Sequence, residues 1–305
     1  MTFDGILPSM ERYNPNQSLP ALEAYLREAL EAPVRLIQAH ELTESTRSAP
    51  WRLDIESDGA THSYVLRTGT DGLAHEFAVL NAMQNTPLPV PRAYGLDEEG
   101  RSLGIPCFLS DFIEGEPLLE PLLAGKAWAE DLYIETVYAL QSITLDDLPT
   151  IADQLEHQTA VDVLEEADRY FLENPQPLAQ TVHKRLLETM PELPEARFSN
   201  GDLWVENIIV RDGKLAGVID FEHAGFSDPI FEFLLSFFVE PKLCGRGIEE
   251  GYCRHMGFDP AYLHWYHGLE FFDTWRWAVK TGKTFVHHSA DSLRTNLEEW
   301  LKQSQ

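Results

Sequence analysis

The chain has 305 residues and a formal net charge of -27, because it carries 50 acidic and 23 basic residues. This charge argues against binding nucleic acid through a basic surface, and the longest apolar run, residues 230–239, is too short to span a bilayer. Three cysteines in no metal-ligand pattern indicate reduced thiols, so we expect a cytoplasmic protein that binds neither nucleic acid nor a membrane, its oligomeric state left open.

Predicted helices and strands alternate in the first third of the chain. Alternation of polar and apolar residues at 63–67 is typical of a half-buried strand, and apolar residues at helical spacing indicate a following helix that carries Glu76. The loop at residues 43–50 is polar and contains no glycine. In chain order, we expect a helix from Ser18 to about residue 31, strands at 35–41, 51–56 and 63–67, a helix at 71–83 and an apolar strand from residue 106.

The rest of the chain is predicted to be mainly helical, apart from one hairpin. Residues 208–210 are a β-branched run, Asp212 and Gly213 are a strong signal for a tight turn, and residues 215–219 return as a second apolar strand. Helices are expected at residues 128–143, 161–172, 178–190 and 229–239, with two or three more after residue 246.

This hairpin fixes where its two ends lie. Asp202 and Asn207 enter it and Asp220 leaves it, so three oxygen-bearing side chains can converge on one small volume. Transfer of a phosphoryl group from ATP needs a carboxylate near the acceptor hydroxyl, and metal ions held by a carboxylate and an amide oxygen. Asp202 is therefore the candidate catalytic residue, and Asn207 and Asp220 are the candidate ligands of Mg²⁺.

The spacing of these residues supports the interpretation. Four residues separate Asp202 from Asn207, as in the catalytic loop of protein kinases. Together with Gly201 and the segments 219–222 and 228–229, they resemble the aminoglycoside phosphotransferase and choline or fructosamine kinase superfamily. Members of that superfamily are small-molecule kinases with a protein-kinase-like fold.

The resemblance implies an α+β fold of two lobes. Residues 1–112 would form the N-terminal ATP-binding lobe, an antiparallel sheet with a helix, which includes the hinge strand. Residues 113–305 would form a mainly helical C-terminal lobe that carries the catalytic loop and the acceptor site.

The same resemblance assigns contacts to the nucleotide. Arg67 would replace the strand lysine that contacts the ATP phosphates, and Glu76 from the next helix would orient it. The exchange is not conservative, because a planar guanidinium is shaped differently from an ammonium; the alternative is an ordinary surface arginine paired with a nearby acid. In the hinge, the Ser110 carbonyl and the Phe112 amide would face the adenine.

Several other positions allow two interpretations each. Hydroxyl groups of the glycine-free loop could contact phosphates, or the loop could be an ordinary polar turn. Glu222 could approach a second metal or cap its loop. Within the aromatic segment 261–278, Glu270 or Asp273 could bind an ammonium group, or the segment could be core. Asn200 stands where the superfamily usually has histidine, and its amide can make comparable hydrogen bonds.

The leading interpretation is an ATP-dependent small-molecule kinase that uses Mg²⁺ and transfers the γ-phosphoryl group to a hydroxyl of a small acceptor. The acidity of the chain would suit a cationic acceptor, or it could be a general surface or salt-tolerance property. The alternative is a nucleotide-binding pseudokinase that acts as a scaffold or sensor, which Arg67, Asn200 and the glycine-free loop suggest. The complete set of Asp202, Asn207 and Asp220 weighs against it.

Overall fold

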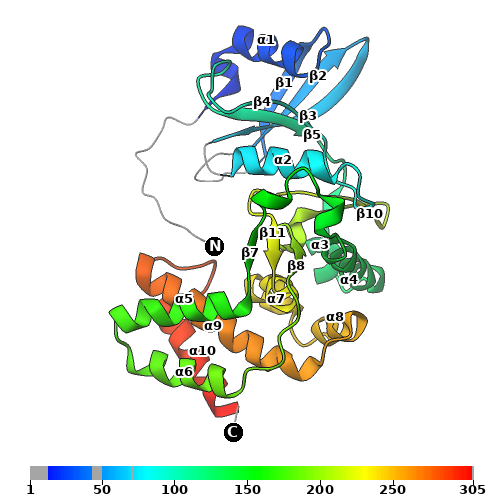
Figure 1. The fold of residues 1–305 in the computed structure, drawn as a ribbon. Helices are drawn as coiled ribbons and strands as arrows, with labels where there is room; N and C mark the ends of the chain where they lie inside the picture. The colour runs from blue at the N-terminus through cyan, green and yellow to red at the C-terminus, as the bar shows by residue number, and fades with distance from the viewer. Residues whose placement is uncertain (1–12, 43–49, 70–71, 304–305) are drawn as a thin grey trace. The chain divides into compact units, whose positions relative to one another are not determined.

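The computed structural model describes residues 13–42, 50–69 and 72–303 (Figure 1). Contacts within the chain group it into two compact units. The first unit is Met1–Pro117, Leu145–Gln154 and Asn207–Ala224, and the second is Leu118–Thr144, Leu155–Glu206 and Gly225–Gln305. This grouping is not a division into a nucleotide lobe and an acceptor lobe, so the boundary expected at residue 112 stays a prediction.

An antiparallel sheet of five strands is the main element of the first unit, as the sequence predicts. Its order is β1-β2-β3-β5-β4, and every neighbouring pair is antiparallel. Asp58 and Gly59, both with positive φ (51° and 77°), form the tight turn that joins β2 to β3. The strands are β1 (Arg35–Glu41), β2 (Trp51–Ser57), β3 (Ala60–Thr68), β4 (Ala93–Asp97) and β5 (Cys107–Asp111).

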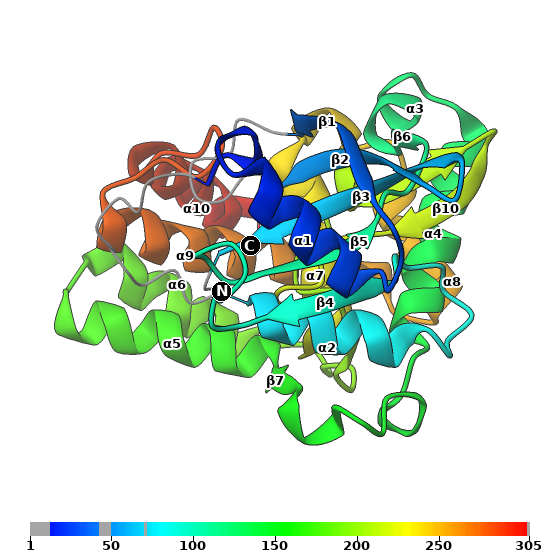
Figure 2. The same ribbon diagram turned by 90° about the horizontal axis from the view of Figure 1, so that it is seen from above.

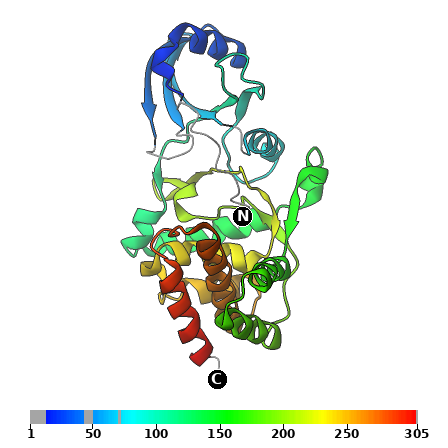
Figure 3. The same cartoon turned by 90° about the vertical axis from the view of Figure 1, so that its left-hand side faces the viewer.

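One face of this sheet forms an apolar core with α1 (Leu19–Ala29). Side chains alternate along a strand, so Leu53 and Ile55 of β2 point to the same side, and both are fully buried. Leu22 and Leu26 of α1 belong to the same core cluster. Figures 2 and 3 show α1, in dark blue, lying across the strands. Burial of this apolar surface holds the helix against the sheet.

The opposite face of the sheet is polar and is partly covered by α2 (Leu73–Met83). By the same alternation, Asp54 of β2 and Arg67 of β3 lie on this face. Phe77 of α2 meets Phe108 of β5 edge to face, with ring centroids 5.7 Å apart. This aromatic contact fixes α2 beside the polar residues.

The hairpin predicted between Asn207 and Asp220 is confirmed. Strands β9 (Ile208–Arg211) and β10 (Lys214–Val218) pair antiparallel, and their turn residues, Asp212 and Gly213, both have positive φ (53° and 70°). A short strand that follows β5, β6 (Glu116–Pro117), pairs with β9. The hairpin therefore belongs to the first unit, although the chain on both sides of it, residues 155–206 and 225–305, belongs to the second.

Helices form most of the second unit, as predicted. Asp228 caps the start of one of them, because its Oδ1 accepts hydrogen bonds from the Ile230 and Phe231 amides at 3.0 and 3.1 Å. No helix in the described ranges is both long and apolar enough to cross a membrane. The elements are α3 (Leu119–Leu123), α4 (Ala127–Gln141), α5 (Ala160–Glu173), α6 (Pro177–Glu188), α7 (Pro229–Val239), α8 (Ile248–Met256), α9 (Leu263–Thr281) and α10 (Ala290–Gln303), with a sheet of order β7-β11-β8 made of β7 (Glu156–Gln158), β11 (Gly225–Ser227) and β8 (Arg197–Ser199).

Aromatic side chains pack these helices together. Phe233 of α7 stacks on Tyr252 of α8 with ring centroids 3.8 Å apart. Gly268 of α9 allows the close approach of α10, because a Cβ there would lie 2.3 Å from the Trp300 ring. The Trp300 indole N–H donates to the His264 carbonyl at 2.7 Å. Figure 3 shows α10, in red, beside α9, in orange.

Gly95 of β4 tests the packing between α1 and the sheet. Its φ is +60°, and a Cβ there would lie 2.3 Å from the Ala29 Cβ. Gly104 also has a positive φ (+77°), but a Cβ there would meet nothing within 4 Å. We expect Gly95→Ala to lower the free energy of unfolding by about 1–3 kcal/mol more than Gly104→Ala, because only Gly95→Ala adds a clash. Urea unfolding measures both variants, and equal losses would contradict the tight contact between α1 and β4.

Candidate active site

Arg67 brings three carboxylates of the first unit together. Its Nη2 lies 2.9 Å from Glu76 Oε2, 3.2 Å from Asp220 Oδ1 and 3.4 Å from Glu222 Oε2. Arg67 comes from β3 and Glu76 from α2, whereas Asp220 and Glu222 lie in the segment that follows β10. The structure thus joins the predicted pair of Arg67 and Glu76, and it places the predicted metal ligand Asp220 beside them.

Glu76 is the most deeply buried member of this cluster, with its side chain 5% exposed. Burial raises the pKa of its carboxyl group to about 7, against the opposing effects of the Arg67 charge and a hydrogen bond from the Phe221 amide. Burial lowers the pKa of Arg67, but the three carboxylates raise it further, so the guanidinium stays charged. Glu76 and Arg67 meet at ion-pair distance without the alignment of a hydrogen bond.

Asn207 and Asp220 are held next to each other through the backbone. The Ile219 amide donates to the Asn207 carbonyl at 2.9 Å. Asp220 has a φ of +64°, a left-handed conformation that Asp tolerates better than most residues. In the described ranges no group of three or more His, Cys, Asp or Glu side chains could hold a metal ion. An amide and a carboxylate oxygen nevertheless fit Mg²⁺, because this ion commonly completes its shell with waters and phosphate oxygens.

The segment after Asp220 packs closely against the start of α2. A Cβ at Gly72 would lie 2.9 Å from both the Cβ and the carbonyl oxygen of Glu222. The ring Nε2 of His75 lies 2.7 Å from the Ala224 carbonyl oxygen. These contacts hold Glu222 where it faces Arg67, and its role at a second metal stays a prediction.

The loop that carries Asp202 belongs to the second unit and is braced from within. The Asn200 Nδ2 donates to the Asp202 carbonyl at 3.1 Å, and the Trp204 amide donates to the same oxygen at 2.7 Å. The Gly201 amide donates to Ser199 Oγ at 3.0 Å. Asn200 therefore makes the bracing contact expected of it. The convergence of the Asp202 side chain with Asn207 and Asp220 stays a prediction.

Strand β5, which the resemblance assigns to the hinge, uses its backbone groups for the sheet. The Phe112 amide donates to the Ser63 carbonyl of β3 at 3.2 Å, and Ser110 pairs with Val65 of the same strand. Adenine contacts through Ser110 and Phe112 stay a prediction, and at Phe112 such a contact would need the bond to Ser63 to open.

The two acidic residues of the aromatic segment, for which ammonium binding and the core are the two alternatives, lie on α9 in different surroundings. Arg276 contacts Asp273 Oδ1 through Nε and Nη2, both at 2.8 Å, so Asp273 is half of an ion pair. Burial raises the pKa of Glu270 to about 8, and the charges of Asp273 and Glu232 add to the effect. Glu232 of α7 also accepts a hydrogen bond from Ser199 Oγ at 2.9 Å.

The sequence motifs do not single out two further charged residues that lie on the same sheet face as Arg67. Arg52 and Asp54 lie on the polar face of β2, where Arg52 Nε donates to Asp54 Oδ1 at 2.9 Å. The signal that could have found them is the pair of opposite charges two residues apart on one strand, which places both on one face.

The glycine-free loop lies outside the described residues apart from Pro50, so its phosphate contacts stay a prediction.

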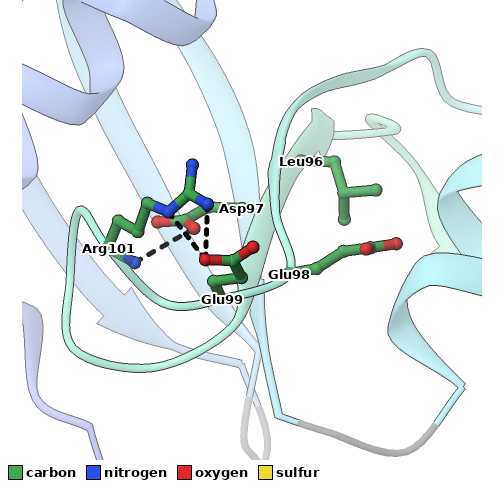
Figure 4. Close-up of a pocket in the computed structure, with 5 residues that line it drawn as sticks. All are labelled: Leu96, Asp97, Glu98, Glu99 and Arg101. Atoms are coloured by element: carbon green, nitrogen blue, oxygen red, sulfur yellow. Dashed lines mark hydrogen bonds and ion pairs between the residues drawn. The ribbon is translucent and has the colours of Figure 1, made fainter.

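One surface pocket of the first unit contains none of the predicted site residues (Figure 4). Asp97 accepts hydrogen bonds from the Arg101 and Ser102 amides at 3.0 and 2.7 Å, and Arg101 Nε donates to Glu99 at 2.8 Å. These bonds stabilise the turn after β4, and we assign the pocket no chemical role. Its lining residues are Leu96, Asp97, Glu98, Glu99 and Arg101.

Comparisons with known proteins identify the family and the fold. Residues 44–277 match the sequence profile of the phosphotransferase enzyme family. A protein of Ralstonia eutropha, provisionally assigned as an aminoglycoside phosphotransferase, has 16% identity and a TM-score of 0.71, covering 96% of this chain and 97% of that one. A thermostable mutant of aminoglycoside phosphotransferase APH(4)-Ia, in a ternary complex with ADP and hygromycin B, has 16% identity and a TM-score of 0.65, covering 92% and 98%.

A third solved structure with the same fold is a choline/ethanolamine kinase family protein from Mesorhizobium loti. It has 13% identity and a TM-score of 0.59, covering 87% of this chain and 88% of that one. Likeness at these identities shows the fold alone. It confirms the α+β, two-lobed protein-kinase-like fold that the sequence predicts.

The buried carboxyl of Glu270 predicts a pH-dependent stability. Its pKa is about 8 in the folded chain, against an ordinary value of 4.5, so the folded state binds one more proton than the unfolded state between these values. The stability that this proton contributes is full below pH 4.5 and is lost as the pH rises through 8. Glu270→Gln cannot ionise, so between pH 5 and 9 we expect wild type to lose about 2–4 kcal/mol relative to this variant.

Urea unfolding at a series of pH values measures this difference. Glu135→Gln, at an exposed position of α4, controls for the loss of one surface carboxylate. A constant difference between wild type and Glu270→Gln across this pH range would contradict the burial of Glu270.

Proposed function

Because the chain belongs to the phosphotransferase enzyme family, it is a phosphotransferase with a hydroxyl acceptor, and we propose that it uses ATP and Mg²⁺ to phosphorylate a small cationic molecule. The observation that carries this proposal is the cluster in which Arg67 meets Glu76 and Asp220. One strand, one helix and one loop, distant in the chain, supply the parts that phosphoryl transfer needs.

Arg67 is proposed to bind the phosphate oxygens of the nucleotide. Its guanidinium can make paired hydrogen bonds to phosphate, and Glu76 holds it in place as a buried ion-pair partner. Asn207 and Asp220 would hold Mg²⁺, which when bound neutralises charge on the phosphates during transfer. Since three carboxylates surround one guanidinium, the cluster has an excess of negative charge that a divalent cation would compensate.

Asp202 is proposed to act on the acceptor. Its carboxylate would accept or orient the proton of the substrate hydroxyl, which makes the oxygen a better nucleophile toward the γ-phosphorus. The short segment between Asp202 and Asn207 links the acceptor side to the metal side, as the motif spacing requires. The bonds from Asn200 and Trp204 to the Asp202 carbonyl support this role, because they limit the freedom of the loop.

A cationic acceptor is supported by the acids of the second unit. Glu232 and Glu270 interact electrostatically, and Glu232 is bonded to Ser199, three residues before Asp202. A positively charged group placed near them would relieve the repulsion that raises the pKa of Glu270. The net charge of -27 would also draw such a molecule to the protein. A protein of the same fold, APH(4)-Ia, holds hygromycin B together with ADP.

Asp202→Asn tests the proposed function. We expect this variant to lose phosphoryl transfer by about 100-fold or more, because an amide cannot accept the proton. Its affinity for the ATP analogue AMP-PNP should stay within about twofold of wild type, since Asp202 is not assigned to the nucleotide. ADP release against a panel of aminoglycosides, amino alcohols and sugars measures turnover, and calorimetric titration measures binding.

Asp212→Asn is the matched control for this experiment. Asp212 lies at the hairpin turn of the same motif, with a φ of 53° that Asn also tolerates. This control should retain wild-type turnover. Unchanged turnover in Asp202→Asn would exclude its catalytic role, and nucleotide binding by wild type without turnover of any acceptor would favour the scaffold alternative.

A further inference from the structure

Arg52 lies on the same sheet face as the proposed phosphate-binding residue Arg67. It pairs with Val65, two residues before Arg67 on the neighbouring strand. Strand geometry therefore places the Cα atoms of Arg52 and Arg67 roughly 8 Å apart. Arg52 also lies over Phe112, which the resemblance assigns to the hinge, so a nucleotide whose phosphates meet Arg67 and whose base faces the expected hinge would bring that base to Arg52.

The Arg52 side chain is held over the hinge by a set of fixed contacts. Its guanidinium carbon lies 4.2 Å from the centre of the Phe112 ring. Nε donates to Asp54 Oδ1 at 2.9 Å and Nη2 donates to Ser63 Oγ at 3.0 Å, and Nη2 lies 3.5 Å from Glu114 Oε1. The side chain is 30% exposed, so a ligand can reach it.

Asp54 makes this arrangement rigid. Its residue is 6% exposed, and burial alone would raise its pKa, but hydrogen bonds from Ser63, Gln38 and Arg52 hold that pKa at about 2. A carboxylate that is buried and charged fixes the guanidinium it binds. Arg52 is thus preorganised before any ligand arrives.

The backbone of the hinge has little capacity left to recognise a base. The Phe112 amide donates to the Ser63 carbonyl, and the Asp111 amide donates to the Arg92 carbonyl at 3.0 Å. By contrast, Nη1 of Arg52 has no hydrogen-bond partner among the described residues, which leaves two N–H donors beside Phe112. A base bound here would therefore meet the N–H donors of Arg52, and not the backbone amide and carbonyl groups of the hinge.

We propose that Arg52 reads the base of the nucleotide donor and makes the site accept guanine at least as well as adenine. Guanine presents two acceptors, O6 and N7, to a guanidinium, whereas adenine presents N7 beside an amino group that is itself a donor. The inference rests on the proposed function and widens its donor from ATP to GTP. It assigns Arg52 to specificity and leaves the transfer step to the residues already named.

A simpler role for Arg52 would be to neutralise Asp54. Lysine would serve that role as well, because it keeps a positive charge, but it lacks a planar group that can bind Asp54 and Ser63 and at the same time hold further N–H donors in a fixed position beside Phe112. Arg52→Lys therefore separates the two roles. A purely structural Arg52 would change stability without changing the preference between bases.

The experiment measures the affinities of the full chain for GMP-PNP and AMP-PNP in the presence of Mg²⁺. We expect wild type to bind GMP-PNP at least as tightly as AMP-PNP, and Arg52→Lys to lower the affinity for GMP-PNP relative to AMP-PNP about tenfold. Arg35→Lys is the matched control, since Arg35 also pairs with an acid across the sheet but lies near the far end of β2. Phe112→Leu removes the ring under the guanidinium, leaves the pair of Arg52 and Asp54, and should lower the same ratio.

The outcomes decide between the roles. A fall of at least fivefold in the ratio for both Arg52→Lys and Phe112→Leu, with Arg35→Lys unchanged, would support the inference. A smaller fall in either variant, or tighter binding of AMP-PNP by wild type, would overturn it and leave the phosphotransferase function standing. Binding of neither analogue by wild type would overturn the proposed nucleotide function and this inference with it. Because binding needs no acceptor, the two failures are distinguishable.

Discussion

The structure of the proposed nucleotide site depends on one guanidinium shared by three carboxylates. The charge of Arg67 joins β3, α2 and the segment that follows β10, because α2 contributes Glu76 and the segment contributes Asp220 and Glu222. A buried carboxylate such as Glu76 is costly without a cation, so its position is tied to that of Arg67. The excess of negative charge that remains is what a divalent cation would compensate.

The parts of the site that depend on local chain geometry could be predicted from the sequence. The tight hairpin turn requires positive φ values, which Asp212 and Gly213 adopt. This turn sets the pairing of the two strands, and the pairing brings the Ile219 amide to the Asn207 carbonyl. Contacts that depend on the sheet register could not be predicted. The bond between the Phe112 amide and the Ser63 carbonyl follows from how far β3 and β5 extend beside each other, which alternation of residue types does not reveal.

The burial of charged residues could also not be predicted from the sequence. Polar positions of a half-buried strand are expected to face solvent, yet Asp54 is almost fully buried because Arg52, Ser63 and Gln38 satisfy it. Similarly, Glu270 sits in an aromatic helix whose pattern is compatible with core or with ligand binding, and only the nearby Glu232 and Asp273 show that it lies among other acids. In both cases the partners come from other elements, so the charge balance is a property of the tertiary structure.

Arg67 is proposed to bind the phosphates of the donor in place of a lysine. Calorimetric titration of wild type, Arg67→Met and Arg67→Lys with AMP-PNP and with adenosine, which share a base and a ribose but differ in their phosphates, tests this role. We predict that Arg67→Met weakens AMP-PNP binding about tenfold or more but adenosine binding by less than about twofold, with partial recovery in Arg67→Lys, because the guanidinium contacts the phosphates and not the nucleoside. Equal affinities of wild type and Arg67→Met for AMP-PNP would contradict it.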